Sequence, residues 1–154
     1  MKDQRKIEGG CLCGSVRYTS SKPPMGGGYC HCSMCRKAYG HLYAALLQFS
    51  HEDFKIIKGK LSYYQESTLA KRSFCQHCGS SISFSYDGQP TLFVLAGTLD
   101  KPDDWPIDDS AGSWGHTFVA DKVAWLEIKD GLPQHAQTVG FLDAAQDAHD
   151  ESNR

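Results

Sequence analysis

The chain has 154 residues, the length of about one domain, and a formal net charge of −2 with a pI near 6.4. This balance gives no overall electrostatic attraction to nucleic acid or acidic membranes, and no apolar run comes near the length of about 18 residues that a membrane span needs. The charged start, Met1 to Lys6, leads into a glycine turn without an apolar signal core. We therefore expect a cytoplasmic protein without nucleic-acid or membrane partners, whose oligomeric state the sequence does not determine.

The chain begins with a short charged lead, residues 1–8, and a glycine-rich turn around Cys11 and Cys13. Alternating or short apolar runs between turn residues then predict nine short strands. These strands cover residues 15–19, 29–32, 42–49, 54–58, 61–65, 81–86, 92–96, 116–119 and 124–128. The run 42–49 is strongly apolar, so a buried helix is an alternative there.

One short helix is predicted at 33–39, with Ser33 as its N-cap and Gly40 as its stop. Turn residues 59–60 and 87–88 predict two β-hairpins. Residues 100–110 carry five aspartates and two prolines, which is typical of a solvated surface loop. The sum predicts a mainly β single domain of short antiparallel strands with little helix.

The structured part is expected to end near Gly131–Leu132–Pro133. We expect the domain to span residues 1–140. Residues 141–154 would then be an acidic C-terminal tail, either frayed or formed into a short exposed helix.

Seven cysteines stand in three tight groups, with the spacings CxC, CxCxxC and CxxC. An odd number cannot pair completely within one chain, and these spacings are too tight for easy disulfide bonds within a group. Without a secretion signal, such spacing favours metal binding over disulfide bonds. The groups are Cys11 and Cys13, then Cys30, Cys32 and Cys35, then Cys75 and Cys78.

Zinc takes four protein ligands in structural sites, and typically three plus an open position in catalytic sites. Groups of two, three and two therefore divide naturally as four plus three, and predict two Zn²⁺ ions per chain. The closed structural site would be formed by Cys11, Cys13, Cys75 and Cys78, and the open one by Cys30, Cys32 and Cys35. A competing grouping joins the two CxxC pairs, as in a zinc ribbon. It would separate Cys30 from Cys32, which face the same way on an extended segment, so we favour the first division.

A zinc ion with three thiolates carries a net charge of −1 and suits capture of a soft fourth ligand, such as a substrate thiol. Coordination would hold that thiol as a thiolate, which can attack a small aldehyde. The alternative is a second structural zinc closed by a histidine, for which the candidates are His31, His41, His51, His77 and His116. The candidates for binding a substrate carboxylate are Arg36, Lys37 and Lys71. Taken singly, each of these residues is more often a core or surface side chain than a ligand.

With these motifs the sequence resembles the glutathione-dependent formaldehyde-activating enzyme family. The resemblance spans roughly residues 8–135 and is carried by residues 10–14, 30–36, 74–80, 96–100, 116–119 and 125–133. It implies a β-tent fold, with the four-cysteine set as structural zinc ligands. It also implies that Cys30, Cys32 and Cys35 hold the catalytic zinc of a carbon–sulfur lyase. In that reaction glutathione and formaldehyde combine reversibly to S-hydroxymethylglutathione.

Two other functions are compatible with the same residues. One is a non-catalytic, zinc-stabilised binding module. The other is a carrier that binds a thiol without turning it over.

Overall fold

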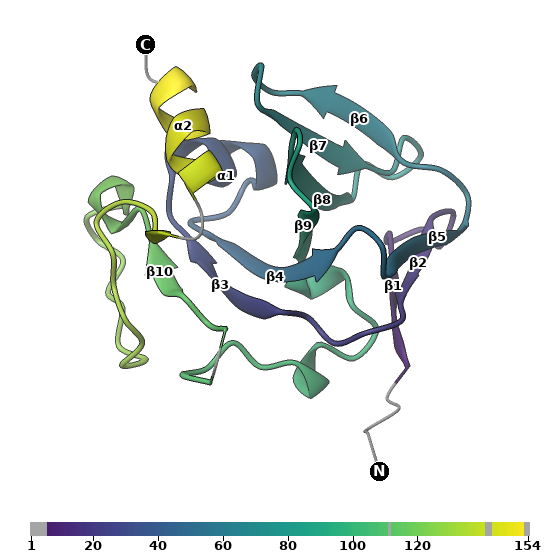
Figure 1. The fold of residues 1–154 in the computed structure, drawn as a ribbon, viewed down its shortest axis with the longest axis horizontal. Helices are drawn as coiled ribbons and strands as arrows, with labels where there is room; N and C mark the ends of the chain where they lie inside the picture. The colour runs from purple at the N-terminus through teal and green to yellow at the C-terminus, as the bar shows by residue number, and fades with distance from the viewer. Residues whose placement is uncertain (1–5, 111, 141–142, 153–154) are drawn as a thin grey trace.

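The computed structural model describes residues 6–110, 112–140 and 143–152. Within these ranges ten strands form two sheets, with the short helices α1 (Ser33–Tyr39) and α2 (Asp143–Ser152) beside them (Figure 1). Three 3-10 turns, η1 (Ala96–Thr98), η2 (Pro102–Asp104) and η3 (Val119–Asp121), connect the later segments. The expected mainly β fold with little helix is thereby confirmed. No helix among the described residues is long and apolar enough to cross a membrane.

The smaller sheet has the strand order β1-β2-β5, with bounds Ile7–Gly10, Arg17–Ser20 and Phe54–Lys58. The larger sheet has the order β10-β3-β4-β9-β8-β7-β6. In that order its strands are Gly115–Thr117, Gly26–Cys30, Ala44–Ser50, Thr91–Leu95, Ser81–Tyr86, Ala70–Phe74 and Ser62–Gln65. Neighbouring strands are antiparallel except β10 and β3, which are parallel.

The larger sheet has a hydrophobic core on each of its two faces. Along β4, Leu47 and Phe49 belong to one core, whereas Ala44 and Leu46 belong to the other. This follows from the alternation of side chains along a strand. Cysteines take part in both cores: Cys11 and Cys75 in the first, and Cys30, Cys32 and Cys35 in the second. The fold thus separates the two groups of thiols.

Gly28 in β3 shows how closely the second core is packed. A Cβ at this position would lie 2.0 Å from Nε1 of Trp114, which is itself buried. Only glycine therefore lets β3 pass under the indole and continue to Cys30.

Eight of the nine predicted strands overlap observed ones, and residues 42–49 form a strand rather than the alternative helix. The ninth, 124–128, is wrong because these residues form a turn and irregular chain. Strands β1 and β7 were not predicted. The predicted hairpin around residues 59–60 is also wrong, because β5 pairs with β2 and β6 pairs with β7. The turn at 87–88 does join an antiparallel pair, β8 and β9.

Helix α1 lies where it was predicted, and it ends at Gly40, whose φ of 61° is left-handed. The predicted N-cap, Ser33, is wrong, because Cys32 occupies the cap position. The Sγ atom of Cys32 accepts a hydrogen bond from the backbone N–H of Cys35 at 3.3 Å. The start of the helix therefore fixes the direction of one thiol relative to another.

The chain remains structured beyond Pro133. The backbone N–H of His135 donates to the carbonyl of His116, and that of Phe118 donates to the carbonyl of Gln137. In α2, the side chains of Ala145, Ala148 and His149 are buried, so this segment is a packed helix and not an exposed one. Its spaced alanines let the helix approach the second core closely. Of the predicted charged lead, residues 1–5 lie outside the described residues, and Ile7 and Glu8 belong to β1.

Candidate metal centres

Four thiols from two distant turns meet at the edge of the first core. Their Sγ atoms all lie within 4.8 Å of one another, and they come from Cys11, Cys13, Cys75 and Cys78. The Cys11–Cys13 and Cys13–Cys75 sulfur distances are 3.6 and 3.9 Å. Four sulfurs at about 2.3 Å from a tetrahedral zinc stand about 3.8 Å apart, so these donors fit a closed Zn²⁺ site.

The surroundings of this cluster favour the thiolate form of Cys11 and Cys78, and the protonated form of Cys75, whose pKa is raised. The backbone N–H of Val16 donates to Cys11 Sγ at 3.2 Å, and the hydroxyl of Ser80 lies 3.2 Å from Cys78 Sγ. Hydrogen bonds from the hydroxyl and the backbone of Ser80 lower the pKa of Cys78 to about 5. At least one thiol is therefore ready to bind a metal at neutral pH.

The other three thiols meet on the opposite side of the larger sheet. Cys30 ends β3, Cys32 caps α1, and Cys35 lies in the first turn of that helix. Their Sγ atoms also lie within 4.8 Å of one another, and all three residues are buried. The structure thus brings the cysteines together as four and three, and the zinc-ribbon grouping of Cys32 and Cys35 with the later CxxC pair does not occur.

Arg72 of β7 is the main residue of this site that sequence reasoning missed. Both of its terminal nitrogens, Nη1 and Nη2, lie 3.9 Å from Cys35 Sγ. Hydrogen bonds from Cys30 and Cys32, and then the positive charge of Arg72, hold the pKa of Cys35 well below its ordinary value, although burial opposes them. Arg72 and Cys35 are 37 residues apart, so no local pattern predicted this contact. The one available signal was an arginine within a strand that leads into the turn with Cys75 and Cys78, where a cation is rare.

His31 lies between two of the thiols in sequence but takes part in a different network. Its imidazole is fully buried, and Nε2 lies 2.8 Å from Nδ1 of His116, whose Nε2 lies 2.8 Å from a carboxylate oxygen of Asp130. Burial, and then the charges of His116 and Lys122, lower the pKa of His31 to about 4, so it is neutral at neutral pH. Nε2 of His31 thus has a hydrogen-bond partner in His116, whereas its buried Nδ1 has none among the described residues.

The structure does not place a described histidine in the three-thiol group. Of the five candidates, His41 lines a pocket, His51 and His77 are exposed, and His31 and His116 bond to each other. A second zinc closed by histidine, the alternative that the sequence left open, therefore has no support in this geometry. Of the candidate cations, Lys71 lies over the ring of Tyr63 instead, and neither Arg36 nor Lys37 lines the pocket.

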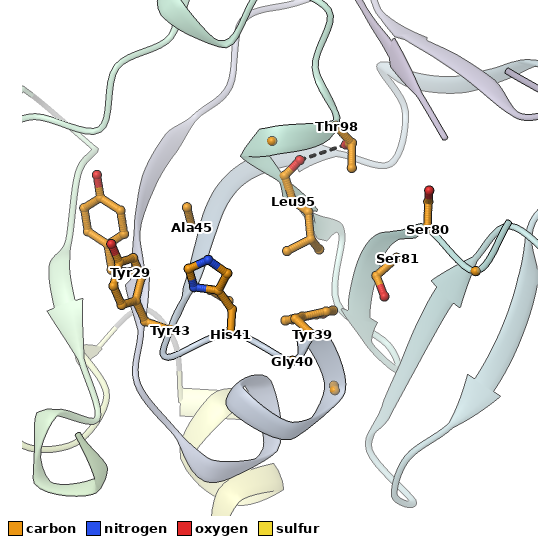
Figure 2. Close-up of a pocket in the computed structure, with 14 residues that line it drawn as sticks. Tyr29, Tyr39, Gly40, His41, Tyr43, Ala45, Ser80, Ser81, Leu95 and Thr98 are labelled. Carbon is orange, nitrogen blue, oxygen red and sulfur yellow. Dashed lines mark hydrogen bonds between the residues drawn. The ribbon is translucent and has the colours of Figure 1, made fainter. Parts of the chain in front are cut away.

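A pocket of about 870 Å³ is lined by residues that neighbour each of the two groups of thiols, and Figure 2 shows its lining. Tyr39 and His41 form one side, Ser80 and Ser81 the other, and Leu95 stands between them. Tyr39 and Leu95 also pack against the core that contains Cys30, Cys32 and Cys35, whereas Ser80 contacts Cys78. The remaining described lining residues are Tyr29, Ala38, Gly40, Tyr43, Ala44, Ala45, Gly79, Gly97 and Thr98. This described part of the lining contains no Asp, Glu, Lys or Arg. A small, largely uncharged molecule could reach the neighbourhood of the buried thiols here.

The fold is that of a mainly β protein with two clusters of cysteines, one of four and one of three, that could each hold a metal ion. The sequence model for the "Glutathione-dependent formaldehyde-activating enzyme" family matches residues 6–119, and the chain belongs to this family.

Relatives and a solved structure agree with this assignment. A Halomonas elongata protein named "Putative glutathione-dependent formaldehyde-activating enzyme" is 28% identical over 132 residues, which is 80% of this chain and 81% of that protein. An uncharacterized lyase of Schizosaccharomyces pombe is 27% identical over 94 residues, 59% of this chain and 66% of the relative. The crystal structure of a Rhodobacter sphaeroides protein is similar with a TM-score of 0.55 and 26% identity, covering 71% of this chain and 99% of that one.

Proposed function

We propose that this protein is a zinc-dependent carbon–sulfur lyase or synthase that joins a small thiol, such as glutathione, to a small aldehyde, such as formaldehyde. The observation that carries the proposal is the group of three buried thiols, Cys30, Cys32 and Cys35, which includes no fourth donor among the described residues and lies beside a pocket. Family membership, and the names of two relatives, support the class of reaction.

The reaction that we propose forms one S–C bond. The thiol sulfur attacks the carbonyl carbon, the π electrons move to oxygen, and the proton lost by the thiol ends on that oxygen. A zinc ion held by the three thiolates would supply an open position that favours the thiolate form of a bound thiol.

The chain's own residues contribute binding and exclusion of water. The buried thiols of Cys32 and Cys35 are held by the start of α1, so their positions are set before a ligand enters. The aromatic and aliphatic side chains of Tyr39, Tyr43 and Leu95 give the pocket an apolar lining, which suits an uncharged carbonyl compound. The reverse reaction would use the same contacts.

The four-thiol site has a separate role in this proposal. It joins the turn after β1 to the turn after β7, across more than 60 residues, so metal binding there would contribute to folding. A reducing compartment such as the cytoplasm would keep all seven thiols available for metal.

Exchange spectroscopy by NMR tests the function. We expect the protein to accelerate interconversion of free glutathione and its formaldehyde adduct, and Cys32→Ser to abolish this acceleration while keeping the fold. Lack of acceleration with glutathione would exclude that thiol, and lack of it with other small thiols as well would overturn the proposed enzyme. Binding of a thiol with no turnover would favour the carrier.

A further inference from the structure

Arg72 is a buried cation with every polar atom engaged. Only 8% of its surface is exposed. Its Nε donates to a carboxylate oxygen of Glu66 at 2.9 Å, and its Nη1 donates to the hydroxyl of Tyr39 at 2.6 Å. The guanidinium also lies over the rings of Tyr39 and Phe84, at 5.0 and 5.2 Å from their centroids. Such a network fixes the position and the plane of the charged group.

The free edge of this guanidinium faces a single sulfur atom. Nη1 and Nη2 are both 3.9 Å from Cys35 Sγ, so the fork approaches the thiol symmetrically. Arginine is suited to such an arrangement because its donors are rigid and its charge is permanent. A buried guanidinium is costly unless it meets a negative charge, and Glu66 supplies only one side of that compensation.

The charge of the thiol cluster explains why a cation is placed here. Three neutral thiols carry no charge, whereas a Zn²⁺ ion with three thiolates carries −1, and a bound substrate thiolate would make this −2. A fixed positive charge beside Cys35 therefore attracts the metal-loaded cluster more strongly than the protonated one. Arg72 has little exposed surface and does not line the pocket, so it is not placed to bind a substrate carboxylate.

We propose that Arg72 is a positioning residue that compensates the negative charge of the three-thiolate metal site and orients Cys35 within it. Glu66 and Tyr39 hold the guanidinium in place for this role. The inference rests on the metal site of the proposed function and not on its substrate. It connects the two sites through β7, since Arg72 in this strand serves one and Cys75, in the turn that follows it, belongs to the other.

Metal affinity tests this role without reference to turnover. The full chain would be titrated with Zn²⁺ against a chromophoric chelator, and with Co²⁺, whose absorption reports the thiolate donors. We expect Arg72→Met to weaken binding at the second site by about 10- to 100-fold, which is typical for loss of a residue that supports a metal ligand. The four-thiol site should keep its affinity. Arg72→Lys keeps the charge but loses the fork, and should fall between wild type and Arg72→Met.

Lys71→Met is the matched control, because it removes the neighbouring positive charge from the same strand. It should leave both affinities and the cobalt spectrum unchanged. If Arg72→Met does not fold, Glu66→Gln provides the second test, since it loosens the guanidinium without removing it and should give a smaller, selective loss at the second site. Wild-type affinity and spectrum in these variants, or an equal loss at both sites, would overturn the inference. Failure of the glutathione assay with normal metal binding would instead contradict only the proposed reaction.

Discussion

Replacement of His116 by leucine tests the buried pair of imidazoles beside the three thiols. In the native chain His116 joins His31, whose surface is 0% exposed, to Asp130 near the surface. His116→Leu removes both hydrogen bonds but keeps an apolar side chain of similar length against Tyr29, on which the native imidazole stacks.

The expected loss of stability follows from how exposed the two partners of His116, His31 and Asp130, are. His31 Nε2 cannot reach water from its buried position, so it keeps the desolvation penalty of an unpaired polar atom, about 1–3 kcal/mol. The Asp130 side chain is 41% exposed and can bond to water instead, so its share is small. We therefore predict that the free energy of unfolding falls by about 1–3 kcal/mol.

Urea unfolding in a zinc-buffered solution measures this loss at constant metal occupancy. In a double-mutant cycle, His31→Leu combined with His116→Leu should cost less than the sum of the single changes, by about 0.5–3 kcal/mol. His135→Leu, which removes a half-buried imidazole from the neighbouring segment, should stay within about 0.5 kcal/mol of wild type. A similarly small effect of His116→Leu, together with additive single changes, would refute the reasoning.

Three further predictions concern metal, pH and packing. Cys75→Ser should lower the melting temperature strongly, whereas Cys32→Ser should lose the second metal and the activity with less loss of stability. Metal analysis and calorimetry measure the two effects. Equal loss of the fold in both variants would contradict this division of roles. Burial opposes the charged form of His149, but hydrogen bonds to Asp121 and Asp150 outweigh it and raise its pKa. The charged pairing of His149 is therefore complete below about pH 6.5 and is lost as the pH rises through the raised pKa of His149. Asp121→Asn should then lower the free energy of unfolding more at about pH 6 than at about pH 9. An equal loss at both pH values would exclude the charged pairing. Gly28→Ala should lower the free energy of unfolding by about 1–3 kcal/mol, because its Cβ would overlap the indole of Trp114. Urea unfolding measures this change. A variant as stable as wild type would show that the indole can shift to make room.

Local patterns in the sequence predicted local structure well. Side chains two residues apart on an extended segment face the same way, and Cys30 and Cys32 do meet. A glycine after a short helical run predicted the end of α1 at Gly40. These features depend on residues within a few positions of one another, so no knowledge of the fold was needed.

Local patterns did not predict which distant strands pair with one another. Residues 54–65 looked like one hairpin, but β5 and β6 belong to different sheets. Gly59 between them has a φ of 68° and lies against the backbone of Ser15, so it carries the chain from one sheet toward the other. The acidic residues of the C-terminal segment likewise led us to expect an exposed segment, although Ala145 and Ala148 of α2 are buried.

The sequence alone determined the number of thiols and their tight spacing. It favoured the division into four and three over the zinc-ribbon grouping, because strand alternation points Cys30 and Cys32 the same way. Only the tertiary structure decided what surrounds them. Arg72 reaches Cys35 across 37 residues, and His31 meets His116 across 85. Such contacts depend on strand order and on which face of the sheet each strand presents, and these are set by the packing of the two cores together.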